Sequence, residues 1–239
     1  MRRRELSLLI AILILTNIGF AQDIPSSPRS REAYDRVAPR LTREMSDSGL
    51  VFGAPVFLRT FKWPSELEVW IKSGDQYSLF RSYPILFWGI GSYGPKTRKG
   101  DMQAVEGFYR ILPSQLNPFS KYHLSINLGY PNQYDVASGY TGSAMMIHGG
   151  ERSNGCFAMS DSGIEEIYTL VEAAFRRGQN QIEIHCFPFP LTDINLTKFS
   201  DRPWLQFWQT LRKGYDYFEA QRVPPFVSVE NGNYLVNGL

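Results

Sequence analysis

A histidine and a cysteine, His148 and Cys156, stand eight positions apart in a glycine-rich segment of this chain. The chain has only two Cys and three His, so one of each this close together is a distinctive feature. A thiol becomes a good nucleophile when a nearby imidazole takes its proton. The pair therefore predicts acyl transfer, with Cys156 as nucleophile and His148 as base.

The residues between the pair favour a tight loop. Gly149, Gly150 and Gly155 permit sharp turns that carry backbone N–H groups toward a reacting carbonyl. Such N–H groups stabilise the oxyanion that forms during acyl transfer. We expect the oxyanion-hole donors to be the N–H groups of Asn154, Gly155 and Cys156.

Each of these residues also has a structural alternative. Cys156 could be an inert buried thiol, which is a common fate of an isolated cysteine. His148 could be a core histidine whose ring bonds a backbone carbonyl. Ser153 fits a loop position in the site and, equally well, a turn in which its hydroxyl bonds its own backbone.

Three segments in order resemble one enzyme family. His148-Gly149 and Ser153-Asn154-Gly155-Cys156 resemble the HG…SxGC signature of the L,D-transpeptidase catalytic domain, the YkuD-type family of peptidoglycan enzymes. Residues 105–111 and 122–132 resemble two further strands of that domain. Residues 155–159 and the helix-like 164–171 are most similar to its YafK-like murein L,D-transpeptidase branch. The resemblance covers about residues 55–190.

The resemblance implies a fold and a reaction. The fold would be mixed and β-rich (α+β): a curved sheet or sandwich with a Cys-bearing catalytic subdomain and peripheral helices. The enzyme would attack peptidoglycan stem peptides, with the backbone carbonyl of Gly149 orienting His148 as the third member of a triad. Release of D-Ala from diaminopimelate would leave a thioester for an amine to capture.

Two other functions stay open. Water could take the acyl group, so that the protein releases a wall-linked lipoprotein or trims cross-links. The chain could also be an inactive wall-binding module, although the intact Cys156 and His148 argue against this. The loop between them is shorter than in many members, Asn154 replaces a frequent His, and Ala158 replaces a frequent Arg. These departures leave the acyl acceptor undecided.

Residues outside the signature are weaker candidates. Tyr109, His123, Tyr130 and Asn132 could line the substrate pocket, while His123 is better explained by a structural role. Ile182, Ile184 and Cys186 alternate along one strand face, so Cys186 is expected to be a small buried apolar residue. His185 on the other face is expected to be solvated or hydrogen-bonded. No Cys/His cluster has zinc spacing, so we expect neither a metal nor another cofactor.

Local patterns predict the elements that position these groups. Residues 22–54 form a linker and a short helical leader, which Pro39 should interrupt. Alternating apolar residues from position 55 predict a meander with one buried face, within a catalytic domain at 55–190. Ser160 or Asp161 should cap a helix that ends at Gly178. A C-terminal extension at 191–239 should contain a helix opened by Asp201 and Pro203, then a hairpin with an Asn-Gly turn.

The first 21 residues have the pattern of a secretory signal. Arg2–Arg4 precede an apolar stretch that is short for a membrane span and ends in small residues. We expect export to the periplasm or cell envelope of a bacterium, with no membrane span after cleavage; an uncleaved anchor is the alternative. Removing residues 1–21 takes away three Arg and one Glu and leaves no net charge. No nucleic-acid partner is therefore expected.

Overall fold

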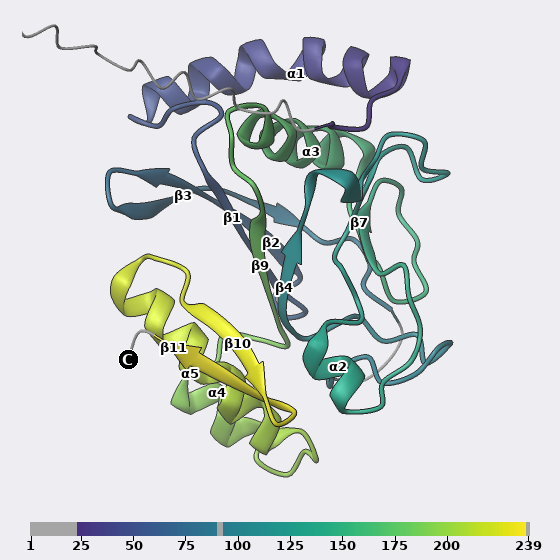
Figure 1. Cartoon of the computed structure of the whole chain (residues 1–239), viewed down its shortest axis with the longest axis vertical. Helices are drawn as coiled ribbons and strands as arrows, with labels where there is room; N and C mark the ends of the chain where they lie inside the picture. The colour runs from purple at the N-terminus through teal and green to yellow at the C-terminus, as the bar shows by residue number, and fades with distance from the viewer. Residues whose placement is uncertain (1–22, 90–92, 238–239) are drawn as a thin grey trace, which may run out of the picture.

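The computed structural model describes residues 23–89 and 93–237, which form a mixed α+β fold with sheets between helices (Figure 1). The predicted signal at 1–21 lies outside these residues. Within them, no helix has the length and apolar content needed to cross a membrane. The helices are α1 (Pro28–Asp47), α2 (Gln133–Ala137), α3 (Asp161–Arg176), α4 (Asp193–Lys198) and α5 (Leu205–Gln221). The strands are β1 (Val56–Phe61), β2 (Glu66–Ser73), β3 (Gln76–Pro84), β4 (Gly107–Ile111), β5 (Leu116–Asn117), β6 (Ser125–Asn127), β7 (Met146–His148), β8 (Phe157–Ala158), β9 (Ile182–Phe187), β10 (Phe226–Glu230) and β11 (Asn233–Asn237), and a 3₁₀ turn spans Pro113–Gln115.

The leader helix α1 is longer than predicted. Ser27 and Ser30 form a capping box around Pro28, so the helix starts inside the expected linker. The prediction that Pro39 interrupts the helix was wrong, because α1 continues through it. Pro39 is exposed, so the carbonyl that loses its intrahelical donor can be hydrated.

The larger sheet has the strand order β3-β2-β1-β9-β4. The predicted meander is confirmed as β1, β2 and β3, which pair antiparallel. Strand β9 lies parallel to β1 and antiparallel to β4. The sheet thus joins the two ends of the long segment that carries His148 and Cys156.

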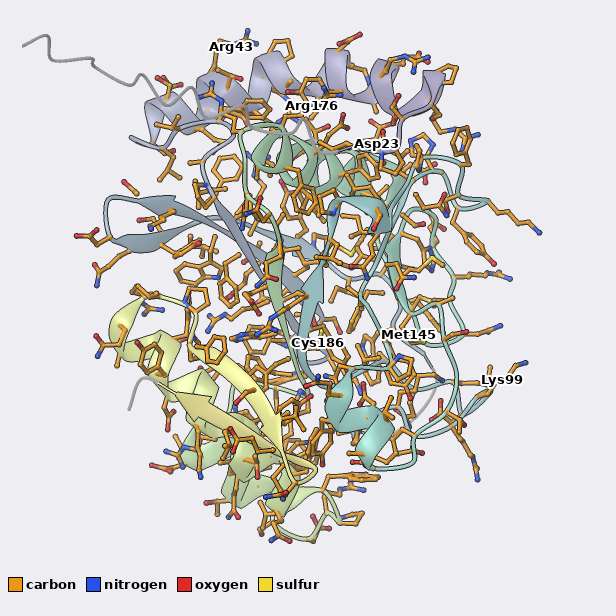
Figure 2. All side chains as sticks on the ribbon, in the orientation of Figure 1. Asp23, Arg43, Lys99, Met145, Arg176 and Cys186 are labelled. Atoms are coloured by element: carbon orange, nitrogen blue, oxygen red, sulfur yellow. The ribbon has the colours of Figure 1, made fainter. Side chains whose placement is uncertain are left out.

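The prediction of one buried face was wrong for β1, whose six residues are all buried. On one face, Leu58 and Ile184 belong to a core that includes residues of α1 and α3. On the other, Phe61 and Phe187 pack against α5 and the C-terminal hairpin. Helices on both sides therefore leave the centre of this sheet no solvent face, as the side chains filling both layers show (Figure 2).

Strand β9 places Cys186 and His185 on opposite faces of the sheet. Cys186 is a buried free thiol among apolar residues, as predicted, and lies at the centre of the molecule in Figure 2. His185 was predicted to be solvated or hydrogen-bonded, and this is wrong. Its ring is buried with no hydrogen-bond partner among the described residues, between the rings of Phe57 and Phe108.

The C-terminal extension covers the second face of the sheet. Helix α5 begins at Leu205, slightly after the expected Asp201–Pro203 start. Strands β10 and β11 pair as predicted around Asn231 and Gly232, both with positive φ, the geometry of a type I′ turn. Arg59 of β1 is buried and bonds Glu219 of α5 at 2.6 Å, so the extension is fastened to the sheet by charge as well as by packing.

The smaller sheet carries the segment with His148 and Cys156. Its order is β5-β6-β7-β8, with β7 and β8 parallel. Helix α3 follows directly, capped by Ser160, whose side chain accepts from the N–H of Gly163. Arg176 near its end lies between α3 and α1 and stacks over Tyr34 of α1 (Figure 2). The leader helix, α3 and the small sheet therefore pack as one unit.

Candidate active site

Strands β7 and β8 bring His148 and Cys156 together. Ile147 pairs with Phe157 and His148 pairs with Ala158, and Cys156 comes directly before β8. Ile147 and Phe157 point into the core. Because side chains alternate along a strand, His148 and Cys156 share the opposite face, on neighbouring strands. The backbone register thus places the two residues on one face, while the hydrogen bond of the thiol goes to the Ala144 carbonyl rather than to His148.

The ring of His148 is held by the next residue. Its Nδ1 lies 2.6 Å from the carbonyl oxygen of Gly149, so Nδ1–H donates and Nε2 is left as the proton acceptor. The side chain is buried, and burial lowers the pKa of His148, which the Gly149 carbonyl partly opposes. The imidazole is therefore neutral at pH 7 and able to accept a proton.

The Gly149 peptide is itself fixed from two sides. Its N–H donates to the carbonyl oxygens of Tyr122 at 3.0 Å and Leu124 at 3.1 Å. The N–H of Gly150 donates to Oδ1 of Asp161, the first residue of α3. A Cβ at residue 149 would lie 2.6 Å from that same carboxylate oxygen and 2.8 Å from the Tyr122 carbonyl. Glycine is therefore the residue that fits between His148 and the groups that hold the Gly149 peptide.

The thiol of Cys156 is half-buried and donates to the carbonyl of Ala144 at 3.7 Å. Burial raises the pKa of this thiol. The backbone of Met146, the side chain of Ser153 and the charge of Lys96 lower it. Burial outweighs them, so Cys156 is a protonated thiol at neutral pH and needs a base to become a thiolate.

The loop before the thiol is tightly packed at one residue. Gly155 has φ +122°, and a Cβ there would lie 2.8 Å from the carbonyl oxygen of Gln103. Asn154 is exposed, whereas the Ser153 hydroxyl is buried with no well-formed hydrogen bond among the described residues. The backbone N–H groups of this loop thus remain the oxyanion candidates, with Ser153 beside them.

The glycine-rich segment before β4 forms a wall of the site. Within it, Lys96 is buried and bonds Asp101 at 2.8 Å. A Cβ at Gly142 would lie 3.1 Å from Cε of Lys96, so the lysine packs on the chain two residues before Ala144. Lys99, in contrast, is exposed and points outward in Figure 2.

Two predicted pocket tyrosines are buried and bonded within the fold. The hydroxyl of Tyr109 lies 3.0 Å from Asp135, whose pKa burial raises to about 6. The hydroxyl of Tyr130 donates to the carbonyl of Thr141. Neither hydroxyl bonds His148 or Cys156 among the described residues, so both tyrosines are held within the fold rather than beside the thiol.

Asn132 lines a separate cavity. Its side chain caps α2 and donates to the carbonyl of Phe108 and to the hydroxyl of Tyr234. The cavity, of about 430 Å³, lies between β4, residues 129–133 and β10. None of its lining residues belongs to the His148–Cys156 site.

His123 lies close to Gly149, the residue after His148, and has no hydrogen bond to Cys156 among the described residues. Its Nε2 is 2.6 Å from Oε1 of Glu165 in α3, which Arg36 of α1 also binds at 2.5 Å. Its Cβ packs against Gly149, since a Cβ at that glycine would lie 3.0 Å away. The structural interpretation of His123 therefore fits the observed contacts.

Sequence reasoning missed three residues around the site. Tyr122 lies over the His148 ring, with 4.6 Å between ring centroids. Asp161 was expected only as a possible helix cap, and Lys96 was not among the candidate residues. Tyr122 lies next to a predicted strand, but its separation from His148 in the sequence gives no sign that the two rings are in contact.

Two solved structures are similar to most of this chain. The helical cell shape determining protein Pgp2 from Campylobacter jejuni is 16% identical, with a TM-score of 0.46 and 80% of each chain covered. Bd1075 of Bdellovibrio bacteriovorus is 22% identical, with a TM-score of 0.39; 69% of this chain and 62% of that one are covered.

Sequence comparison is more decisive. The family model for the L,D-transpeptidase catalytic domain (YkuD) matches residues 67–184. An Escherichia coli K12 protein, YafK, whose name carries a provisional assignment as an L,D-transpeptidase, is 39% identical over 234 residues, 98% of this chain and 91% of the relative. The protein of the same name from Escherichia coli O157:H7 matches equally well. The chain therefore belongs to the L,D-transpeptidase family of the YkuD type.

Proposed function

We propose that this protein is a cysteine-dependent transpeptidase that forms a thioester with the diaminopimelate residue of peptidoglycan stem peptides. The family acts on such stem peptides. The observation that supports the proposal best is the 2.6 Å contact from His148 Nδ1 to the Gly149 carbonyl, which frees Nε2 for the thiol on the same face. Cys156 is then the nucleophile and His148 the general base.

In the acylation step, Nε2 of His148 takes the proton of the Cys156 thiol as the sulfur attacks the diaminopimelate carbonyl carbon. The oxyanion is stabilised by backbone N–H groups of residues 154–156. The carbon–nitrogen bond to the terminal D-Ala then breaks, and His148 gives its proton to the leaving amine. D-Ala departs, and the acyl group remains on sulfur.

In the transfer step, an amine of a second stem peptide attacks the thioester carbonyl. His148 accepts a proton from that amine, the carbon–sulfur bond breaks and a new amide forms. The sulfur leaves as a thiolate and takes the proton back from His148. The same base therefore serves both halves of the reaction.

Hydrolysis is the second candidate because of the loop that precedes the thiol. Glu151, Arg152 and Asn154 are exposed, and the thiol itself is half-buried. A short, exposed loop shields a thioester poorly from water. With water in place of the amine, the products would be a free stem-peptide carboxylate and either D-Ala or a released wall-linked lipoprotein.

The proposed location is the periplasm or cell envelope of a bacterium. The charged and apolar pattern of residues 1–21 supports export, and the substrate lies outside the cytoplasmic membrane. Fusion of residues 1–30 to a reporter enzyme that is active only after export tests this. Reporter activity that persists when Arg2–Arg4 and the apolar stretch are replaced would count against it.

The reaction is tested with purified protein lacking residues 1–21. It is incubated with tetrapeptide muropeptides and, separately, with muropeptides that carry a covalently linked protein. New 3-3 cross-links or amine exchange, seen by mass spectrometry, support the transferase. Release of linked protein with ¹⁸O from labelled water in the new carboxylate supports the hydrolase instead. No turnover by wild-type protein, together with equal inertness of C156A, would contradict both.

A further inference from the structure

The residue that covers the base is Tyr122. Its ring lies over the imidazole of His148, with 4.6 Å between centroids and 31° between planes. Its backbone carbonyl accepts from the Gly149 N–H, at 3.0 Å. The ring of Tyr122 therefore contacts His148, and its carbonyl contacts the Gly149 peptide that orients His148.

Tyr122 is not a core residue. Its side chain is 57% exposed, so its packing contributes little to the general stability of the fold. The face of the Tyr122 ring that lies over His148 restricts rotation of the buried imidazole and excludes water from that side of it. These effects bear on proton transfer more than on folding.

The segment that carries Tyr122, residues 118–123, is fastened to the start of the leader helix α1. Ser27 Oγ donates to the carbonyl of Pro118 at 2.9 Å. Arg29 Nη1 donates to the carbonyls of Ser120 at 3.0 Å and His123 at 2.8 Å. Ser27, the N-cap of α1, and Arg29 in its first turn thus hold both ends of a segment about ninety residues away in the chain.

A backbone outlier lies at the same place. His123 has φ +64°, a left-handed conformation that costs a non-glycine residue free energy. The contacts of Arg29 with its carbonyl and of Glu165 with its Nε2 hold it there. Backbone held against its preference at one residue from Tyr122 indicates that the position of this segment is imposed by its neighbours.

We propose that Tyr122 is a positioning residue for His148, and that Ser27 and Arg29 of the leader helix fix it in place. The proposal rests on the role proposed above for His148. The leader then acts on catalysis through a chain of contacts. Helix α1 fixes the position of residues 118–123, Tyr122 fixes the orientation of the His148 imidazole, and that imidazole controls the loss of the Cys156 proton.

The test uses a readout that needs no wall substrate. The rate of Cys156 alkylation by iodoacetamide measures thiolate formation, and Cys186 is too buried to react. Y122A is expected to slow alkylation about 3- to 10-fold at neutral pH, the size of one aromatic contact. Y122F should restore the wild-type rate, because the contacts above use the ring and the backbone. F119A is the matched control: Phe119 is a 73% exposed aromatic on the same segment.

The leader is tested by a second matched pair. R29A should slow alkylation, as Y122A does. R31A should not, because Arg31 bonds the side chain of Ser26, five residues before it, and not residues 118–123. Protein labelled with ¹⁵N-histidine reports the imidazole directly, since the chain has three His. Y122A and R29A should lose the single Nδ1–H tautomer of His148.

Failure of this inference and of the proposed function can be told apart. Wild-type alkylation rates and an unchanged His148 tautomer in Y122A, or an equal loss in F119A, overturn the positioning role even if the enzyme cross-links peptidoglycan. A faster reaction in Y122A overturns it too, since the ring would then act as a shield for the thiol. Slower alkylation in Y122A with recovery in Y122F upholds it even if no wall substrate is turned over.

Discussion

The indole N–H of Trp208 donates a 2.8 Å hydrogen bond to Oε2 of Glu106, and both side chains are fully buried. The other oxygen of Glu106 accepts from Lys62 Nζ at 2.8 Å and from the N–H of Gly94 at 2.9 Å. One carboxylate therefore joins the C-terminal helix, the end of β1 and the glycine-rich wall of the site.

Replacement of Trp208 tests this junction. W208F removes the donor and leaves a buried carboxylate oxygen unpaired, which should lower the free energy of unfolding by about 1–3 kcal/mol. Urea denaturation followed by circular dichroism measures the change. W63F is the control because Trp63 is 45% exposed. Equal losses in the two variants would mean that the hydrogen bond contributes nothing.

The nucleophile is tested by removing each cysteine in turn. C156A should abolish the thioester adduct with a carbapenem, and C186A should keep it, because Cys186 is buried and burial raises the pKa of its thiol to about 12. Intact-mass spectrometry resolves the adduct. Labelling of Cys186 in the C156A protein would show that the site is misassigned.

The base is tested through pH. Burial lowers the pKa of His148 from its usual 6.5, so the neutral, proton-accepting form persists below that pH. The acylation rate should therefore hold at pH 6.5 and fall only at lower pH. H148A should reduce the rate at pH 7 by about 10²- to 10⁴-fold and leave a rate that rises with ionisation of the thiol above pH 9. H185F is the control; an equal loss there would indicate damage to folding.

Gly155 tests the geometry of the oxyanion loop. G155A adds a Cβ 2.8 Å from the Gln103 carbonyl at φ +122°, so the loop must shift. Acylation should fall by at least about 10-fold, the effect of about 1.4 kcal/mol of lost transition-state stabilisation. G139A is matched for positive φ, at +72°, but meets nothing within 4 Å. Equal losses of acylation rate in G155A and G139A would mean that the positive φ, and not the contact with the Gln103 carbonyl, is what requires glycine.

His185 predicts a loss of stability in acid. Burial, with a smaller contribution from Arg59, lowers the pKa of His185 to about 3 from 6.5. The unfolded chain therefore binds this proton below pH 6.5 while the folded chain does not, and stability falls as pH drops from 6.5 toward 3. H185F should reduce that decline. Free energies of unfolding at pH 7 and pH 4.5 give the slopes, and identical slopes would refute the assignment.

Local signals predicted much of the framework. Ser160 was recognised as a cap because its side chain can bind the N–H three residues later, and Asn231-Gly232 as a hairpin turn because both residues tolerate positive φ. These are properties of a few neighbouring residues. The His148–Cys156 pair was found in the same way, from residue types within one short segment.

The failures all depend on distant neighbours. His185 was placed on a polar face because β9 alternates, but α5 and Phe57 cover that face. Pro39 was expected to break α1, yet packing of the rest of the helix on α3 outweighs one lost hydrogen bond. Tyr122 contacts His148 from a segment whose carbonyls bond Ser27 and Arg29, about ninety residues away in the chain. Sequence spacing contains none of these contacts.

The order of strands has a consequence for how the protein becomes active. Strand β9 lies between β1 and β4, yet it follows both in the chain. Until residue 187 is available, the sheet lacks the strand that joins β4 to β1, and the segment with His148 and Cys156 is an unclosed loop. Closing so long a loop is slow, because its entropy is lost before its contacts form. A chain emerging in order from the N-terminus would therefore bring His148 and Cys156 into the folded sheet late, when most of its length has been delivered.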